Sequence, residues 1–179
     1  TSTNDMVSLF STNKAKNPII KKANDPRLKS FNKAVHEVLL NLAKQVAFDG
    51  EGASKFIKIN CVKCKSDKDA KNISFSIANS LLVKTAIAGE DPNWGRIAMA
   101  IGKSSANIDE KKLSIFIGPY KIFFKGSLYK EYDELKVSEY MKNESIEITA
   151  DIGMGNKNFT AYTMDLTKKY IEINADYRT

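Results

Sequence analysis

One long amphipathic helix, predicted over residues 25–48, is the feature that most constrains the fold. Asp25 is a good N-cap and Pro26 suits the first helical position, while Asp49-Gly50 ends the pattern. Between these signals, apolar side chains recur every three or four residues, which places them on one face of a helix. That face consists of Leu28, Phe31, Val35, Val38, Leu39, Leu42 and Val46.

The rest of the chain alternates between strand and helix patterns at short intervals. Residues 56–64 predict a strand with Ile57, Ile59 and Cys61 on one face. Further strands are expected at 113–117 and 121–124, joined as a hairpin, and at 145–152 and 158–164; further helices at 66–79, 91–101 and 133–141. This order predicts an α+β or mixed α/β fold.

Composition indicates a globular protein of one or two small domains. The chain has 179 residues, of which 42% are hydrophobic and 27% charged, so it can bury a real core. Its apolar runs are far too short to span a bilayer, and no secretory signal opens it. Two cysteines do not form a disulfide framework, which favours a reducing compartment. We therefore expect a cytoplasmic protein that does not associate with membranes.

The net charge of +7 would suit an anionic partner such as nucleic acid. The lysines are scattered, however, with only pairs such as Lys21-Lys22 and Lys111-Lys112, and no aromatic residues interleave with them. This pattern indicates a solvated basic surface, and we expect no nucleic-acid partner.

A metal site is not expected from the Cys61-Val62-Lys63-Cys64 segment, despite its spacing. Zinc needs four ligands, and the only further candidate is His36, the one histidine of the chain. On a regular strand, moreover, the two sulfurs would point to opposite faces.

Two loop segments have both a functional and a structural interpretation. In residues 50–55, glycines flank Glu51, so the backbone can approach a ligand while the carboxylate pairs with an ammonium group; alternatively, Glu51 is an exposed residue at a helix end. In residues 91–96, a helix N-terminus next to Trp94 and Arg96 can bind an anion; alternatively, it is a capped helix with Trp94 in the core.

The first residue, Thr1, is of a type that can act as an N-terminal nucleophile, with its own α-amine as the base. The alternative is that a chain starting with threonine is a fragment. Residue type alone favours the fragment.

Five segments together carry a resemblance to a known family. The segments are Thr1-Ser2-Thr3-Asn4-Asp5, Gly50-Glu51-Gly52-Ala53-Ser54-Lys55, Ala88-Gly89-Glu90-Asp91-Pro92-Asn93-Trp94-Gly95-Arg96, Ala150-Asp151-Ile152-Gly153 and Ile173-Asn174-Ala175-Asp176-Tyr177-Arg178-Thr179. In their order and spacing, the chain resembles the C-terminal part of the β chain of the ornithine acetyltransferase family, also called glutamate N-acetyltransferase, of arginine biosynthesis. The resemblance covers the whole chain.

The resemblance implies a mechanism and a fold. Family precursors cut themselves into an α and a β chain, and the new N-terminal threonine carries acetyl from N-acetylornithine to glutamate. The family places that threonine in a Met-Ala-Thr-Met-like motif, which does not occur here, whereas Thr1 matches a later stretch. The resemblance thus implies a nucleophile upstream, no catalytic residue in this chain, and a chain that is inactive alone. The implied fold is layered, DmpA/ornithine-acetyltransferase-like and of the N-terminal-nucleophile type.

The resemblance also implies three substrate-binding residues. Glu51 matches the family's Gly-Glu-Gly glutamate, and Asn174 and Thr179 match residues of the closing motif. Glu51 would neutralise the substrate ammonium, while the amide and the hydroxyl orient polar substrate atoms. The tail must then fold back into the site, and we expect Ile171 and Ile173 to anchor it by apolar packing, with ion pairs from Asp176 and Arg178.

The implied partners are the α chain and the rest of the β chain, in an αβ hetero-oligomer, with no cofactor; some family members also use acetyl-CoA as a donor. The expected domains are residues 1–54, completed by upstream segments, and residues 55–179. Two other classes remain open: a non-catalytic module that binds small metabolites, and a basic nucleic-acid-binding protein, which salt-dependent binding to random DNA would support.

Overall fold

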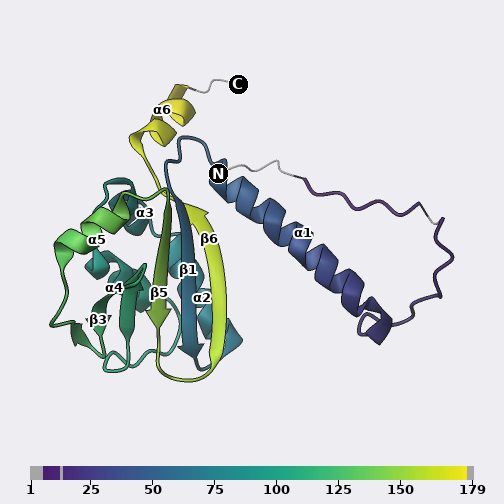
Figure 1. Ribbon diagram of the computed structural model, residues 1–179, viewed down its shortest axis with the longest axis horizontal. Coiled ribbons are helices and arrows are strands. Elements are labelled where there is room, and N and C mark those ends of the chain that lie inside the picture. The colour runs from purple at the N-terminus through teal and green to yellow at the C-terminus, as the bar shows by residue number, and fades with distance from the viewer. Residues whose placement is uncertain (1–5, 13, 177–179) are drawn as a thin grey trace. The chain divides into compact units, whose positions relative to one another are not determined.

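The computed structural model describes residues 6–12 and 14–176 (Figure 1). The chain divides into two compact units, Thr1–Val46 and Ala47–Thr179. The first holds the η1 turn, Pro26–Leu28, and most of helix α1, Lys29–Phe48. The expected domain boundary between residues 54 and 55 stays a prediction.

The long helix predicted from the sequence is present. Asp25 caps the η1 turn by accepting a hydrogen bond from the Arg27 backbone at 3.0 Å, and α1 follows without a break to Phe48. None of the described residues of the first unit is buried, so the apolar face of α1 is open to solvent in this chain. Phe31 is 52% exposed and Val38 is 58% exposed.

The second unit is built on a mixed sheet, to which the described residues contribute six strands in the order β4-β3-β2-β5-β1-β6. Strands β1 and β5 are parallel neighbours, and the remaining pairs are antiparallel. The strands are β1 Phe56–Cys64, β2 Ser114–Ile117, β3 Tyr120–Phe124, β4 Ser127–Leu128, β5 Ser145–Asp151 and β6 Lys157–Met164. The helices are α2 Asp67–Ala78, α3 Leu81–Ala88, α4 Trp94–Gly102, α5 Glu134–Met141 and α6 Lys168–Asp176. The mixed α/β class expected from the sequence is thereby confirmed.

The core lies on one face of the sheet. Side chains of β1 and β5 alternate between buried and half-exposed positions, as their sequences predict, and α2 packs against β1 and β6 on the buried side (Figure 1). The fully buried residues of these two strands are Ile57, Ile59, Cys61, Ile146, Ile148 and Ala150. Each fully buried isoleucine contributes about 1.5–3 kcal/mol relative to an exposed one.

Two helices differ from the sequence expectation. The segment after α2 forms a separate helix, α3, because Asn79 ends α2 and Ser80 caps the next helix through the Val83 backbone. The C-terminal segment forms α6, in which Ile171 is 64% exposed and Ile173 is 37% exposed. The expectation that these isoleucines anchor the tail in apolar packing is therefore wrong.

Candidate functional site

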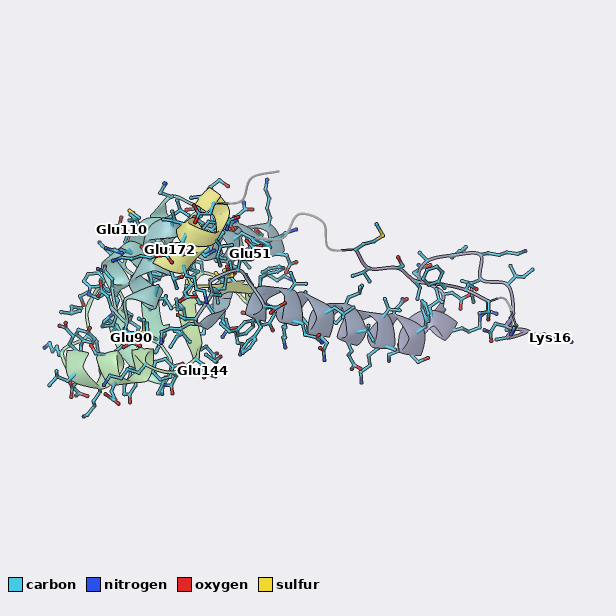
Figure 2. All side chains as sticks on the ribbon, turned by 90° about the horizontal axis from the view of Figure 1, so that it is seen from above. Lys16, Glu51, Glu90, Glu110, Glu144 and Glu172 are labelled. Atoms are coloured by element: carbon cyan, nitrogen blue, oxygen red, sulfur yellow. The ribbon has the colours of Figure 1, made fainter. Side chains whose placement is uncertain are left out.

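Glu51 and Asn174 lie together at one end of the second unit. Glu51 follows α1, in the loop that leads into β1, and Asn174 lies on α6. The amide Nδ2 of Asn174 donates a hydrogen bond to Oε2 of Glu51 at 3.0 Å and a second one to the carbonyl of Tyr170 at 2.9 Å. Glu51 is exposed and labelled in Figure 2, as is Glu172 on α6. Two of the three expected substrate-binding residues thus meet; Thr179, like Thr1, lies outside the described residues.

The glycines beside Glu51 let its loop pack against the segment around α6. Gly52 has a φ of +69°, and a Cβ there would lie 2.6 Å from the backbone nitrogen of Tyr170. A Cβ on Gly50 would lie 1.7 Å from the sulfur of Met164. The sequence argument allowed for close approach of a ligand, and the structure shows close approach of the protein itself.

Asp165, between β6 and α6, binds the same loop through a buried carboxylate. Its side chain is 1% exposed. Oδ1 accepts hydrogen bonds from the backbone nitrogens of Ser54 at 2.9 Å and Lys55 at 3.1 Å, and Oδ2 accepts one from the Ser54 hydroxyl. Two residues further on, the Thr167 hydroxyl donates to the carbonyl of Gly52 at 2.6 Å. The buried carboxylate is therefore well satisfied, and its bonds join the Glu51 loop to the start of α6.

Lys55 links the loop to residues 88–96, another of the five segments that carry the family resemblance. Its side chain is 8% exposed, and Nζ lies 3.1 Å from Oε1 of Glu90 and 3.2 Å from the carbonyl of Asn143. Glu90 follows Gly89, the C-cap of α3, and has a φ of +57°. The next backbone nitrogen, that of Asp91, donates to the Ala86 carbonyl at 2.9 Å. A nearly buried ammonium thus pairs with a carboxylate that a helix end holds in place.

The residues that follow Glu90 form the start of helix α4 and pack against neighbouring elements. Helix α4 begins at Trp94 with Asn93 as its N-cap, and not at residue 91, where the sequence predicted the start. Trp94 stacks on Phe123 with ring centroids 5.2 Å apart, and Arg96 donates to the Leu82 carbonyl at 2.9 Å. Among the two interpretations of this segment, the geometry matches a capped helix with a packed tryptophan.

A groove of about 700 Å³ runs beside α6 without including Glu51 or Asn174. It lies between the end of α3 and the first turns of α6. Its lining consists of Thr85, Ala88, Gly89, Leu166, Thr167, Lys168, Lys169, Ile171 and Glu172. The groove therefore shares α6 with the Glu51–Asn174 pair but presents other side chains.

The cysteines differ from the expectation for a regular strand. The pairing of β1 with β6 shifts register between Cys61 and Cys64, and Lys63 has a φ of +54°, so both sulfurs point into the core, 3.1 Å apart. Burial raises the pKa of both thiols. Within residues 6–12 and 14–176, no group of three or more metal-ligating side chains is found, and His36 is exposed.

Sequence reasoning missed Asp165 and Thr167. The segment Asp165-Leu166-Thr167 lies between a strand and a helix. Polar residues in that position commonly cap the helix, so this pattern could have marked Asp165 and Thr167 as structurally important. Asp165 instead turns its carboxylate back to the Glu51 loop. No helix in the described part of the chain is long and apolar enough to cross a membrane.

These features define a mixed α/β protein in which helix α6 packs against a glycine-containing loop, residues 50–55. The family model of the ArgJ family matches residues 1–179. The chain belongs to the ArgJ family.

Relatives named arginine biosynthesis bifunctional protein ArgJ are similar over the full length of the chain. The protein of Bartonella henselae is 45% identical over 179 residues, and that of Bradyrhizobium diazoefficiens is 48% identical over 182 residues; each alignment covers 100% of this chain and 44% of the relative. The chain thus spans less than half the length of these curated relatives.

A solved structure shares the fold. The crystal structure of the arginine biosynthesis bifunctional protein ArgJ from Bacillus halodurans superposes with a TM-score of 0.88 at 36% identity. The match covers 99% of this chain and 83% of that one.

Proposed function

We propose that this chain forms part of an acyltransferase that moves acetyl from N2-acetylornithine to glutamate in arginine biosynthesis. An acetyl-threonine intermediate would carry the group, on a threonine outside this chain. Membership of the ArgJ family supports the reaction class. The observation that carries the proposal is the direct hydrogen bond between Glu51 and Asn174, two residues that the family resemblance assigns to substrate.

The chemistry of the pair suits an amino-acid substrate. Glu51 is exposed and accepts the Asn174 amide on Oε2, so its carboxylate is oriented and still reachable by a ligand. A carboxylate held in this way can take a substrate ammonium in a charge-assisted hydrogen bond. Asn174 would orient polar substrate atoms beside it, and Thr179 would complete the set.

The partners that we propose are the α chain and the rest of the β chain of the same protein, as an αβ hetero-oligomer in the cytoplasm. The exposed apolar face of α1 supports this, since an amphipathic helix in a protein takes most of its stability from the packing of that face against a partner. The comparisons add support: the chain covers 83% of the solved Bacillus chain but 44% of the curated relatives, so the solved chain is about half as long as those proteins. We propose no cofactor, and acetyl-CoA as a possible second acetyl donor.

The test is acetyl transfer from N-acetylornithine to glutamate, measured with this chain alone and with the chain assembled with the rest of the protein. We expect turnover only in the assembled protein, because the acyl-accepting threonine is supplied by it. Thr1→Ala is the control and should leave the assembled activity unchanged. Robust turnover by the chain alone, abolished in Thr1→Ala, would make Thr1 the nucleophile and overturn the proposal.

A further inference from the structure

Two segments that are far apart in the sequence contribute the Glu51–Asn174 pair, and their contacts converge on one buried group. Glu51 lies in the loop of residues 50–55, and Asn174 lies two turns into α6. Asp165 accepts hydrogen bonds from Ser54 and Lys55 in the loop and stands three residues before α6 begins. A bond between two exposed side chains contributes little by itself, so its geometry must come from the backbone on either side.

We propose that Asp165 is a positioning residue: its carboxylate holds the Glu51 loop against the start of α6 and so sets the distance between Glu51 and Asn174. The inference rests on the substrate role proposed for that pair. Three donors from two consecutive residues bind one carboxylate, which fixes both its position and the backbone of the loop.

The neighbouring contacts make Asp165 the centre of this connection. On the α6 side, Thr167 donates to the Gly52 carbonyl, and Gly52 lets the loop approach Tyr170. On the side of the sheet strands, the backbone nitrogen of Asp165 donates to the carbonyl of Lys55 at 3.1 Å. This bond extends the pairing of β6 with β1 by one residue. Lys84, whose pKa burial lowers, lies near enough for the Asp165 charge to act on it. Removing the carboxylate therefore leaves the loop amides without their acceptor and the half-buried Lys84 without its counter-charge.

Two substitutions separate the hydrogen-bonding role from simple loss of packing. Asp165→Asn keeps one acceptor oxygen for the two backbone donors, and its amide can donate to the Ser54 hydroxyl. Asp165→Ala removes every acceptor. Ser114→Ala is the matched control. Ser114 lies on β2, away from the loop, is 4% exposed, and its hydroxyl accepts a hydrogen bond from the backbone nitrogen of Lys125.

The first measurement is amide hydrogen exchange of residues 168–176 in the assembled protein. We expect Asp165→Ala to accelerate amide exchange in α6 by at least about tenfold. Without the carboxylate, local opening of α6 has no hydrogen bonds to Ser54 and Lys55 to break, so it costs less free energy. Asp165→Asn and Ser114→Ala should stay close to the parent protein. Unchanged α6 exchange in Asp165→Ala would overturn the proposal, and this measurement requires no enzymatic activity.

The second measurement is a double-mutant cycle on acetyl transfer. Asp165→Ala should raise KM for N-acetylornithine about tenfold in the parent protein but change it by less than about threefold in the Glu51→Gln background, where the positioned group is already impaired. Losses that multiply in full would mean that Asp165 acts independently of Glu51, which overturns the proposal. If the parent protein transfers no acetyl, the proposed function fails, and the exchange measurement alone decides the role of Asp165.

Discussion

Asn174 donates a hydrogen bond from Nδ2 to Oε2 of Glu51 across 3.0 Å, although the two residues are 123 positions apart. The contact joins the loop that follows α1 to helix α6. Sequence resemblance assigns both residues to substrate, and the fold places them close enough to act on one ligand. The consequences concern both binding and the backbone that carries the two residues.

Replacing Glu51 by glutamine should weaken the use of N-acetylornithine by the assembled protein. Glutamine keeps an acceptor for Asn174 but loses the negative charge that would hold the substrate ammonium. Loss of one charge-assisted contact costs about 1.5–3 kcal/mol, which corresponds to a fall of roughly 10- to 150-fold in kcat/KM. Glu172→Gln, which removes another exposed carboxylate, one on α6, is the control and should change little. Equal kinetics for parent and Glu51→Gln would leave Glu51 as an ordinary helix-end residue.

Gly52→Ala should destabilise the chain, whereas Gly102→Ala should not. At Gly52 the backbone has a φ of +69° and a Cβ would lie 2.6 Å from the Tyr170 nitrogen, so alanine must displace the loop from α6. Nothing lies within 4 Å of a Cβ on Gly102, at the end of α4. We expect a loss of about 1–3 kcal/mol for Gly52→Ala and a gain of up to about 1 kcal/mol for Gly102→Ala in urea unfolding. Equal midpoints would contradict the close packing of this loop.

The sequence predicted α1 and the strands β1, β2, β3, β5 and β6 because their signals are local, whereas the two-residue strand β4 was not predicted. Alternation in β1 and β5 and the Asp25-Pro26 start of α1 depend on side-chain period and capping, which short windows contain. Helix α6 was missed because its residues are polar and its isoleucines stay exposed, so no apolar period marks it. The Cys61–Cys64 contact was missed because it depends on a register shift between β1 and β6, which neither strand reveals alone.

The candidate site was predictable only in part. Resemblance supplied Glu51 and Asn174, but their hydrogen bond results from the path of the chain between β6 and α6. The position of Asp165 before a helix predicts a helix cap and not the bonds that it makes to the Glu51 loop. Its partners, Ser54 and Lys55, are 111 and 110 positions away. Long-range polar contacts of this kind depend on the topology of the fold. The sequence pattern predicts the fold class but not the topology.

Ile148→Ala should destabilise the second unit far more than Leu135→Ala. Ile148 is fully buried on β5, between β1 and β2, while Leu135 on α5 is 84% exposed. Truncating a buried isoleucine costs about 2–5 kcal/mol because a cavity remains, whereas a surface change stays within about 0.5 kcal/mol. Urea unfolding followed by circular dichroism measures both. Similar losses for the two variants would contradict the assignment of the core to this face of the sheet.

Cys61 and Cys64 should resist alkylation in the folded chain and make its stability fall at alkaline pH. Burial raises the pKa of both thiols, and the thiolate is the reactive form, so iodoacetamide at pH 8 should label the native chain much more slowly than the urea-unfolded chain. Below the unfolded thiol pKa of about 8.5, both states are protonated and the contribution to stability is complete. Above it, the unfolded state releases its protons first, so the free energy of unfolding falls as pH rises. Cys61→Ala should therefore flatten the decline in stability above about pH 8.5, relative to the parent chain. An unchanged slope, or native labelling as fast as unfolded labelling, would show that the sulfurs are not held in the core.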